Sequence, residues 1–509
     1  MTTLWNQLER AARLRGTADA VSCNGQRMSW ASARSRAARM ASVLNALGVT
    51  SGARVAFLGP NGLTYMLMPF ATECAGGVFV PMNSRLAVPE LIDQLKDSTP
   101  MLLLAAQSFS APASEAAAKT GVRLLMLDGD HGFESLVAKS QEMVPVARPT
   151  GDPIAIYYTG GTTGRSKGVI CTSERLAINS LQWAHAVSAR ADERLLIVAP
   201  MFHMIAALNC VIASVLACDM TILERFTPEA ALKAISEDRI TNLALVPTMI
   251  DMLLAVDGFE SYDLSSLRSL TYGGSPIGRN TMKGALQGFR TAQLYQIYGQ
   301  TEGGPTISVL GAQWHSEEAG RAEKLRSAGK PMALTDVAIL RPDGTECARG
   351  ETGEIAVRGP GVSPGYWNRP DEDAAAHRNG WLHTGDAGYL DDDGFLFIVD
   401  RIKDMIVSGG ENVYAAEVER VVAVHPAVLE CAVIGIASDR WGEAVHAIVR
   451  LRPQSVIGTQ DITNFCSERL AGFKVARSVE FRTEPFPLTG AGKVDKKALR
   501  RDCQLRHHG

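Results

Sequence analysis

Residues 157–168 read Tyr-Tyr-Thr-Gly-Gly-Thr-Thr-Gly-Arg-Ser-Lys-Gly. The apolar run at 153–158 has the length and composition of a buried strand, so the glycines come just past the end of that strand. Glycine lets backbone amides turn tightly and approach an anion, while the hydroxyl groups and Lys167 add further donors. The stretch therefore predicts a loop that holds a polyphosphate at the end of a buried strand.

The spacing of this loop differs from that of a P-loop. A P-loop has a second glycine five residues after its first, followed by lysine and then serine or threonine. Counted from Gly161, Ser166 stands at the position of that second glycine, and Gly168 follows Lys167. A surface loop rich in glycine, serine and threonine is the alternative that this stretch alone leaves open.

The composition is that of a globular protein with more than one core. At 509 residues the chain is long enough for about two to four domains. The net charge of -3 gives no basic excess of the kind that nucleic-acid binding requires. The nine cysteines are scattered without a CxxC pair, which predicts reduced thiols, no disulfides and no structural zinc.

Neither the beginning of the chain nor its most apolar segment resembles a targeting or membrane segment. The first sixteen residues carry both charges and lack a central apolar block, which argues against a secretory signal. Residues 195–218 carry no formal charge, but Pro200, His203 and Asn209 interrupt them. A strand at 195–199 followed by a buried helix from Met204 is favoured over a membrane span. A cytoplasmic protein without a transmembrane segment is expected.

From residue 29 to about 310, short apolar runs alternate with helical stretches. Ser29 is placed to cap a helix that ends at Gly48, and a second helix is expected at 64–73. This alternation predicts an α/β fold with mostly parallel sheets covered by helices, and such sheets bind ligands at the carboxyl ends of their strands. The expected strands are 54–58, 77–81, 101–105, 123–127, 154–158, 195–199, 220–223, 242–246, 269–272 and 293–298.

The last third of the chain has two regions with different sequence patterns. Residues 329–400 contain short strands separated by turn clusters, which predicts a small β subdomain. Residues 401–509 alternate helix and strand and predict a compact α+β domain. The expected elements are strands at 337–340, 353–357, 395–399, 429–436, 444–451 and 479–481, and helices at 413–424 and 462–470.

Four further polar clusters stand at the ends of predicted elements. Residues 298–302, Tyr-Gly-Gln-Thr-Glu, offer an aromatic face, a hydroxyl and a carboxylate, and residues 381–386 end in Asp386. Residues 400–404, Asp-Arg-Ile-Lys-Asp, lie where the predicted β subdomain meets the predicted α+β domain. Residues 487–493 place Lys493 on a glycine-rich tip. Taken singly, each has an ordinary alternative as a turn, a linker or a solvated loop.

Together, in this order, the clusters resemble those of the adenylate-forming superfamily of acyl-CoA synthetases, luciferases and peptide synthetase adenylation domains. The resemblance covers essentially the whole chain and is strongest to bacterial fatty-acyl and feruloyl-type CoA ligases. Gly160 and Ser166 depart from the serine and proline that the family often has, but the lysine and the other glycines are in place. The resemblance implies an N-terminal domain at 1–400, with its β-rich part at about 329–400, and a mobile C-terminal domain at 401–509.

The resemblance implies that a carboxylate attacks the α-phosphorus of ATP, giving an acyl adenylate and pyrophosphate, and that a thiol then displaces AMP. The first step builds negative charge on a phosphoryl centre, which positioned cations and donors stabilise. Lys493 is implied to neutralise that charge, and Glu302 with Thr159 to hold Mg²⁺. The residues implied to bind ATP or AMP are Thr159, Gly160, Gly161, Thr162, Thr163, Gly164, Lys167, Gly273, Gly274, Ser275, Tyr298, Gly299, Gln300, Thr301, Glu302, Asp386, Arg401 and Lys493.

The resemblance also implies that the C-terminal domain rotates about Lys403 between the two half-reactions, with CoA as the thiol co-substrate. Gly410 is then expected to leave room for the pantetheine arm. Trp441, Phe473, Lys474 and Arg477 fall where related ligases contact the CoA nucleotide, and a plain surface is the alternative for these four.

The acyl group is expected to lie among residues 201–209, 272–276 and 297–306, where His203 matches a histidine that lines the acyl pocket in many relatives. These segments are small and apolar and offer no cation for a second carboxylate, which favours a hydrophobic monocarboxylic acid, either a medium or long fatty acid or an aromatic acid. Loading of a carrier protein and a non-catalytic acyl or nucleotide sensor stay open as alternatives. A homodimer is also left open.

Overall fold

In the computed structural model the chain is described over residues 3–160, 166–316, 321–408, 411–438, 440–488 and 494–507. It forms two compact units. The first comprises Met1–Val337 and Val357–Leu382, and the second comprises Ala338–Ala356 and His383–Gly509. The division of the domains at residue 400 stays a prediction.

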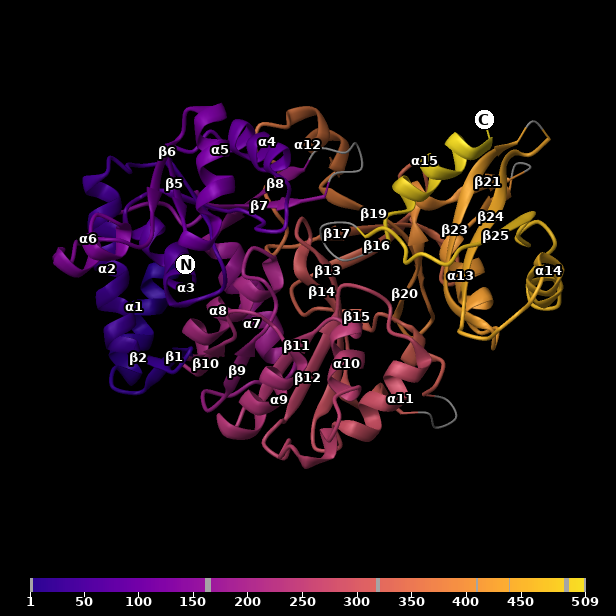
Figure 1. Ribbon diagram of the computed structural model, residues 1–509, viewed down its shortest axis with the longest axis horizontal. Helices are drawn as coiled ribbons and strands as arrows, with labels where there is room; N and C mark the ends of the chain where they lie inside the picture. The colour runs from indigo at the N-terminus through magenta and orange to yellow at the C-terminus, as the bar shows by residue number, and fades with distance from the viewer. Residues whose placement is uncertain are drawn as a thin grey trace. The chain divides into compact units, whose positions relative to one another are not determined.

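Two large sheets build the first unit (Figure 1). All strand pairs of the first sheet are parallel except β7 with β8. In the second sheet the five pairs from β1 through β10, β9, β11 and β12 to β13 are parallel. The first sheet has the order β6(Arg123–Met126), β5(Leu102–Ala105), β3(Arg54–Leu58), β4(Val78–Pro81), β7(Pro153–Thr159), β8(Lys167–Thr172), and the second has the order β15(Lys330–Pro331), β14(Gly304–Leu310), β13(Gln293–Gln300), β12(Ser269–Gly273), β11(Asn242–Leu245), β9(Arg194–Ile197), β10(Asp219–Ile222), β1(Asp19–Cys23), β2(Gln26–Ser29).

Helices cover both faces of each sheet. Because side chains alternate along a strand, Val55 and Phe57 of β3 face one apolar core while Ala56 and Leu58 face another. The helices are α1(Leu4–Arg15), α2(Trp30–Ala46), α3(Leu63–Cys74), α4(Val88–Ser98), α5(Ser110–Thr120), α6(Phe133–Lys139), α7(Ser173–Ala186), α8(Met204–Leu216), α9(Pro228–Glu237), α10(Pro247–Leu254), α11(Arg279–Gly288) and α12(Pro370–Ala376).

One core is shared by the inner faces of the two sheets and by α1, α2, α3, α7 and α8, which fill the layer between them. The outer face of the first sheet packs on α4 and α5, and that of the second on α9, α10 and α11. The unit is therefore a stack of alternating helical and sheet layers, and the α/β fold class is confirmed. Within the described residues no helix combines the length and apolar character that a membrane span needs.

A smaller β sheet has the order β16(Asp336–Leu340), β17(Gly353–Arg358), β19(Trp381–Leu390), β18(His377–Arg378), with β20(Leu396–Arg401) beside β19. Strands β16, β17 and β19 each contain the boundary between the two units. Residues 381–386 belong to β19, where Thr384 and Asp386 are buried, so Asp386 is not the turn residue that was its ordinary alternative.

The second unit contains the expected α+β domain. Its sheet has the order β22(Glu411–Val413), β21(Ile406–Ser408), β24(Gly442–Leu451), β23(Val428–Ser438), with β25(Ser478–Phe481) parallel to β24. Its helices are α13(Ala415–Ala423), α14(Thr459–Ser467) and α15(Lys496–His507). The helix expected at 413–424 is shorter, because Val413 instead pairs with Ile406 in the hairpin of β21 and β22.

Candidate active site

Two of the predicted clusters meet in the first unit. Thr159 is the last residue of β7, and Glu302 follows the end of β13. The Thr159 hydroxyl donates to Glu302 Oε1 at 3.1 Å, across 143 residues of sequence. The Tyr366 hydroxyl donates to the same oxygen at 3.2 Å. Thr159 and Glu302, one from each of the two clusters, therefore meet at the carboxyl ends of strands from both large sheets.

Lys167 opens β8 on the far side of the glycine loop. Its ammonium group lies 5.0 Å from the centre of the Tyr366 ring, at the distance of a cation–π contact. Gly160 is exposed, with open space around the position of a Cβ. Gly161, Thr162, Thr163 and Gly164, predicted to hold phosphates, lie outside the described residues.

A buried arginine that the sequence analysis missed holds the backbone of Thr301 and Glu302. Arg175 lies in the first turn of α7, with its side chain buried and its backbone amide bonded to Thr172 Oγ1. Its guanidinium donates to the carbonyls of Thr301 and, at 2.9 Å, of Gly361. Because a guanidinium carries five donors in a rigid fork, one side chain fixes two loops.

Asn179, one helical turn later, completes this support. Its Nδ2 donates to the Gly361 carbonyl at 3.0 Å, and its Oδ1 accepts from Thr306 Oγ1 at 3.1 Å. Gly304 has φ +87°, and a Cβ there would lie 2.6 Å from Asn179 Oδ1. Glycine is therefore required where the chain turns from β13 into β14.

The glycines predicted to lie beside adenine come at the end of β12. Gly273 is paired with Ile297 of β13, and a Cβ on Gly273 would lie 2.3 Å from the Ile297 carbonyl oxygen. Gly274 has φ +80°. The two strand ends therefore bring Gly273, Gly274 and Ser275 beside the segment that contains Tyr298, Gly299 and Gln300.

His203 is the N-cap residue of α8, and its ring centre lies 4.5 Å from that of Phe202. Burial, assisted by the charge of Arg85, lowers the pKa of His203 to about 4. The imidazole is therefore neutral at pH 7 and suits an apolar surface.

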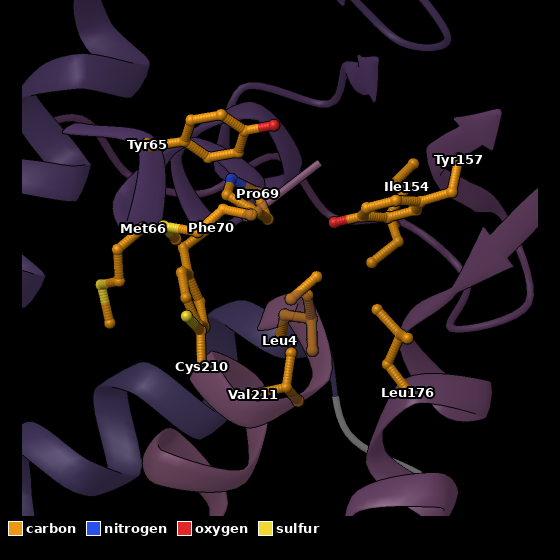
Figure 2. Close-up of a pocket in the computed structure, with 13 residues that line it drawn as sticks. Leu4, Tyr65, Met66, Pro69, Phe70, Ile154, Tyr157, Leu176, Cys210 and Val211 are labelled. Carbon is orange, nitrogen blue, oxygen red and sulfur yellow. The ribbon is translucent and has the colours of Figure 1, made fainter. Parts of the chain in front are cut away.

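A small apolar cavity is lined by residues of α3, β7 and α8 (Figure 2). Tyr65 and Pro69 of α3 face Ile154 and Tyr157 of β7 across it. Its volume of about 20 Å³ suits a single water molecule and not an organic acid. From the segments expected to contact the acyl group, Met201 and Ala207 line it.

In the second unit, Asp386 and Arg401 form an ion pair. The β19–β20 register places the two residues opposite each other, and Arg401 Nη1 lies 2.8 Å from Asp386 Oδ1. The Asp386 side chain is 7% exposed and that of Arg401 44%. Burial and the charge of Arg401 lower the pKa of Lys403, two residues further on.

The residues predicted to contact CoA have protein partners in this unit. The guanidinium carbon of Arg477 and that of Arg440 each lie 4.7 Å from the Trp441 ring centre. Lys474 forms an ion pair with Glu417 at 2.8 Å, and Phe473 packs against the apolar core. Gly410 and Lys493 lie outside the described residues.

Known proteins are similar to this chain over nearly its whole length. Residues 8–367 match the AMP-binding enzyme family, and residues 417–493 match the AMP-binding enzyme C-terminal domain. A feruloyl-CoA synthase of Amycolatopsis is 41% identical over 97% of each chain, and a long-chain-fatty-acid–CoA ligase of Mycobacterium tuberculosis is 35% identical over 93% of each. The crystal structure of ATP-bound MatB from Rhodopseudomonas palustris is 28% identical, with a TM-score of 0.89 over 98% of this chain and 99% of that one.

Proposed function

This chain belongs to the AMP-binding enzyme family and is an AMP-forming acid–thiol ligase, and from that premise we propose that it joins a hydrophobic monocarboxylic acid to CoA. The single observation that supports the proposal best is the bond of Thr159 to Glu302, which unites a phosphate loop and an acidic cluster. Feruloyl and long-chain fatty acyl groups are named for two relatives, and both are hydrophobic monocarboxylic acids.

The reaction runs in two steps on one acyl group. A carboxylate oxygen attacks the α-phosphorus of ATP, the bond to the β-phosphate oxygen breaks, and pyrophosphate leaves. The CoA thiol then loses its proton to solvent, its sulfur attacks the acyl carbon, the bond from that carbon to the phosphate oxygen breaks, and AMP leaves with the electron pair of that bond. Both steps gather negative charge on phosphate oxygens, so the donors near the ends of β7 and β13 suit them.

We propose that Thr159, Lys167 and the glycines between them hold the β- and γ-phosphates. Tyr298 lies against adenine with Gly273, Gly274 and Ser275, and Thr301 contacts the α-phosphate. Asp386 and Arg401 hold the ribose hydroxyls, because a buried carboxylate accepts hydrogen bonds strongly from a diol.

The residues around Glu302 fit a magnesium ion. A carboxylate within 3.1 Å of a threonine hydroxyl is a pair of hard oxygen donors, and Mg²⁺ takes one or two carboxylates together with substrate phosphates. When bound, the ion neutralises charge on the phosphates. The protein's own role is to hold the Glu302 carboxylate in place. Arg175 contributes to this by fixing the backbone next to Glu302.

We propose further that residues 401–509 move as a domain about Lys403. Lys493 neutralises charge at the α-phosphate in the first step and withdraws before the second, when residues 408–412 contact the pantetheine arm. The lysine acts in the first step and the CoA thiol in the second, both at the same reacting acyl group. A lysine on a separate, mobile domain can leave before the thiol enters.

The decisive experiment is a panel of carboxylic acids with ATP, Mg²⁺ and CoA, in which AMP and thioester are measured together. Medium and long fatty acids, benzoates and hydroxycinnamates form its arms, and dicarboxylates and amino acids are the controls. Equimolar AMP and acyl-CoA with a hydrophobic acid is the expected result. AMP release that requires a carrier protein in place of CoA would favour the carrier-loading alternative, and failure of acid-dependent pyrophosphate exchange with every acid would favour a non-catalytic sensor.

A further inference from the structure

Three side chains of metal-binding type meet inside the second unit, apart from the residues assigned to ATP or CoA. They are His446 on β24, Glu480 on β25 and Cys503 on α15. Cys503 Sγ lies 3.4 Å from His446 Nε2 and 3.5 Å from Glu480 Oε2, and the two latter atoms are 3.7 Å apart. His446 is 4% exposed and Cys503 1%.

The secondary structure brings these residues together. In the parallel register of β24 and β25, His446 lies beside Ser478, and Ile448 lies beside Glu480. His446 and Glu480 therefore point from the same face of the sheet, because side chains alternate along a strand. Helix α15 covers that face, with Leu499 and Cys503 one turn apart in the apolar cluster around Ile448. The result is a polar trio between α15 and the sheet, in which His446 and Cys503 are buried and the Glu480 side chain is 22% exposed.

The spacing of the three atoms matches one metal coordination sphere. Zinc bonds of about 2.3 Å to sulfur and about 2.0 to 2.2 Å to nitrogen and oxygen place tetrahedral ligands about 3.4 to 3.6 Å apart. The two separations from Cys503 Sγ, 3.4 and 3.5 Å, fall in this range, and the 3.7 Å between His446 Nε2 and Glu480 Oε2 is about 0.1 Å longer. Cysteine, histidine and carboxylate are also the ligand types that such a cation prefers.

Neighbouring groups orient two of the three ligand atoms. Ser478 Oγ lies 2.7 Å from His446 Nδ1, so Nε2 is the nitrogen that faces the trio. Arg506 Nη1 lies 2.8 Å from Glu480 Oε1, which leaves Oε2 toward Cys503. Metal-binding histidines and carboxylates usually have such outer partners, which fix the orientation of the ligand.

We propose that His446, Glu480 and Cys503 bind a thiophilic divalent cation of the Zn²⁺ class, with water as the fourth ligand. Binding replaces the thiol proton of Cys503, so one proton is released from this residue for each cation bound. This site differs in kind from the hard-oxygen site proposed at Glu302.

Such a cation would join α15 to the sheet of the second unit. Helix α15 begins three residues after Lys493, and Asp495 N donates to the Pro487 carbonyl at 2.8 Å. The described residues on the two sides of the proposed catalytic lysine are therefore joined by this bond, and α15 follows them directly. Because the unfolded chain lacks the site, bound metal should also raise the thermal stability of the unit.

The test is a Co²⁺ titration of the full-length, chelator-treated protein in which His507 and His508 are replaced by alanine, so that the histidine tail does not compete. One equivalent of bound Co²⁺ with a thiolate-to-cobalt charge-transfer band is expected, and Zn²⁺ should displace it. Cys503→Ser and His446→Gln should each weaken binding by more than about 100-fold, since loss of an outer partner alone costs about 10-fold to 100-fold. Ser478→Ala, which removes such a partner, should weaken it by about 10-fold or more.

Cys466→Ser is the matched control, because Cys466 is a fully buried cysteine in the apolar core of the same unit. It should keep both the band and the stoichiometry. The proposal is overturned if the wild-type side chains give no charge-transfer band, if the band survives Cys503→Ser, or if Cys466→Ser abolishes it equally. If Cys503→Ser fails to fold, by circular dichroism, Glu480→Gln and the wild-type titration still decide the matter.

Discussion

Two acidic residues with proposed roles at ATP are held in place in different ways. Glu302, in the first unit, depends on Arg175, a buried side chain from a distant helix that holds its backbone. Asp386, in the second unit, pairs directly with Arg401, which belongs to a predicted motif and is 44% exposed. The first unit thus adds to the motif contact of Thr159 with Glu302 a buried support from outside the motifs, whereas in the second the motif residues Asp386 and Arg401 pair with each other.

This difference has an energetic consequence. A buried charge that donates to backbone carbonyls strengthens the whole unit, because its loss leaves those acceptors without partners in an apolar interior. A pair with one partner near water contributes little to stability, since solvent competes with it. Substitutions should therefore reduce both stability and activity in the first unit, but mainly activity in the second.

The largest effect on activity is expected from Lys493→Ala. Loss of a charge that acts only in the transition state of the first step should lower adenylate formation by about 10² to 10³-fold. Thioester formation from pre-made acyl adenylate should change little, and so should the midpoint of unfolding. Acid-dependent pyrophosphate exchange and a single-turnover thioester assay measure the two steps. Lys497→Ala, at an exposed position of α15, is the control, and equal loss of both half-reactions would contradict the assigned role.

Arg175→Lys should have the next largest effect, on both stability and activity. Lysine keeps the charge but loses the fork that reaches Thr301 and Gly361, so the free energy of unfolding should fall by about 2 to 3 kcal/mol. Because Glu302 is then less well held, more Mg²⁺ should be needed for half-maximal pyrophosphate exchange. Urea unfolding and a Mg²⁺ titration provide the measurements.

The exposed Arg190→Lys serves as its control, with a change within about 0.5 kcal/mol. A loss of stability without any change in the Mg²⁺ requirement would show that Arg175 supports the fold and not the position of Glu302.

Whether a segment consists of apolar core residues or of motif residues also explains which strands could be predicted from the sequence. The strands from 54–58 to 293–298 were predicted correctly because they are short apolar runs, and the inner ones such as β4, β5 and β11 are buried at every position, as parallel strands often are. Strands β8 and β19 were missed because glycine, lysine, threonine and aspartate occupy them, and the hairpin of β21 and β22 was not predicted. Functional composition therefore hid the strand pattern where motif and element coincide.

The supporting residues were harder to find than the motifs. Arg175 reaches Thr301 across 126 residues and Gly361 across 186, and its partners are backbone carbonyls, which have no sequence signature. The available signal was weak, because Arg175 shares its buried helix face with the polar residues Asn179 and Gln182. His446 and Cys503, 57 residues apart, likewise lack the short spacing of a metal motif.

A moderate effect, confined to nucleotide binding, is expected from Asp386→Asn. Loss of the carboxylate charge should raise the KM for ATP by about 10-fold to 100-fold, since hydrogen bonds to charged groups contribute about 1.5 to 3 kcal/mol. The unfolding midpoint should barely move, because Arg401 is solvated. Steady-state kinetics at varied ATP measures the change. Asp336→Asn, which breaks the exposed pair with Arg358, is the control, and an unchanged KM for ATP would remove Asp386 from the site.

The smallest effect concerns the pH dependence of the first unit. Burial lowers the pKa of His203 to about 4, below the ordinary value of about 6.5, so the unfolded chain binds more protons between these values. Stability should therefore fall as pH drops from about 6.5 toward 4, and His203 alone should account for about 1 to 2 kcal/mol between pH 7 and pH 5. His203→Gln should flatten the slope of unfolding free energy against pH by that amount.

His315, buried against Tyr272 with its pKa also lowered to about 4, contributes in the same direction, so His315→Gln serves as the parallel measurement. An unchanged slope in His203→Gln would mean that its imidazole is as well solvated as in the unfolded chain, and that the proposed acyl surface is open to water there.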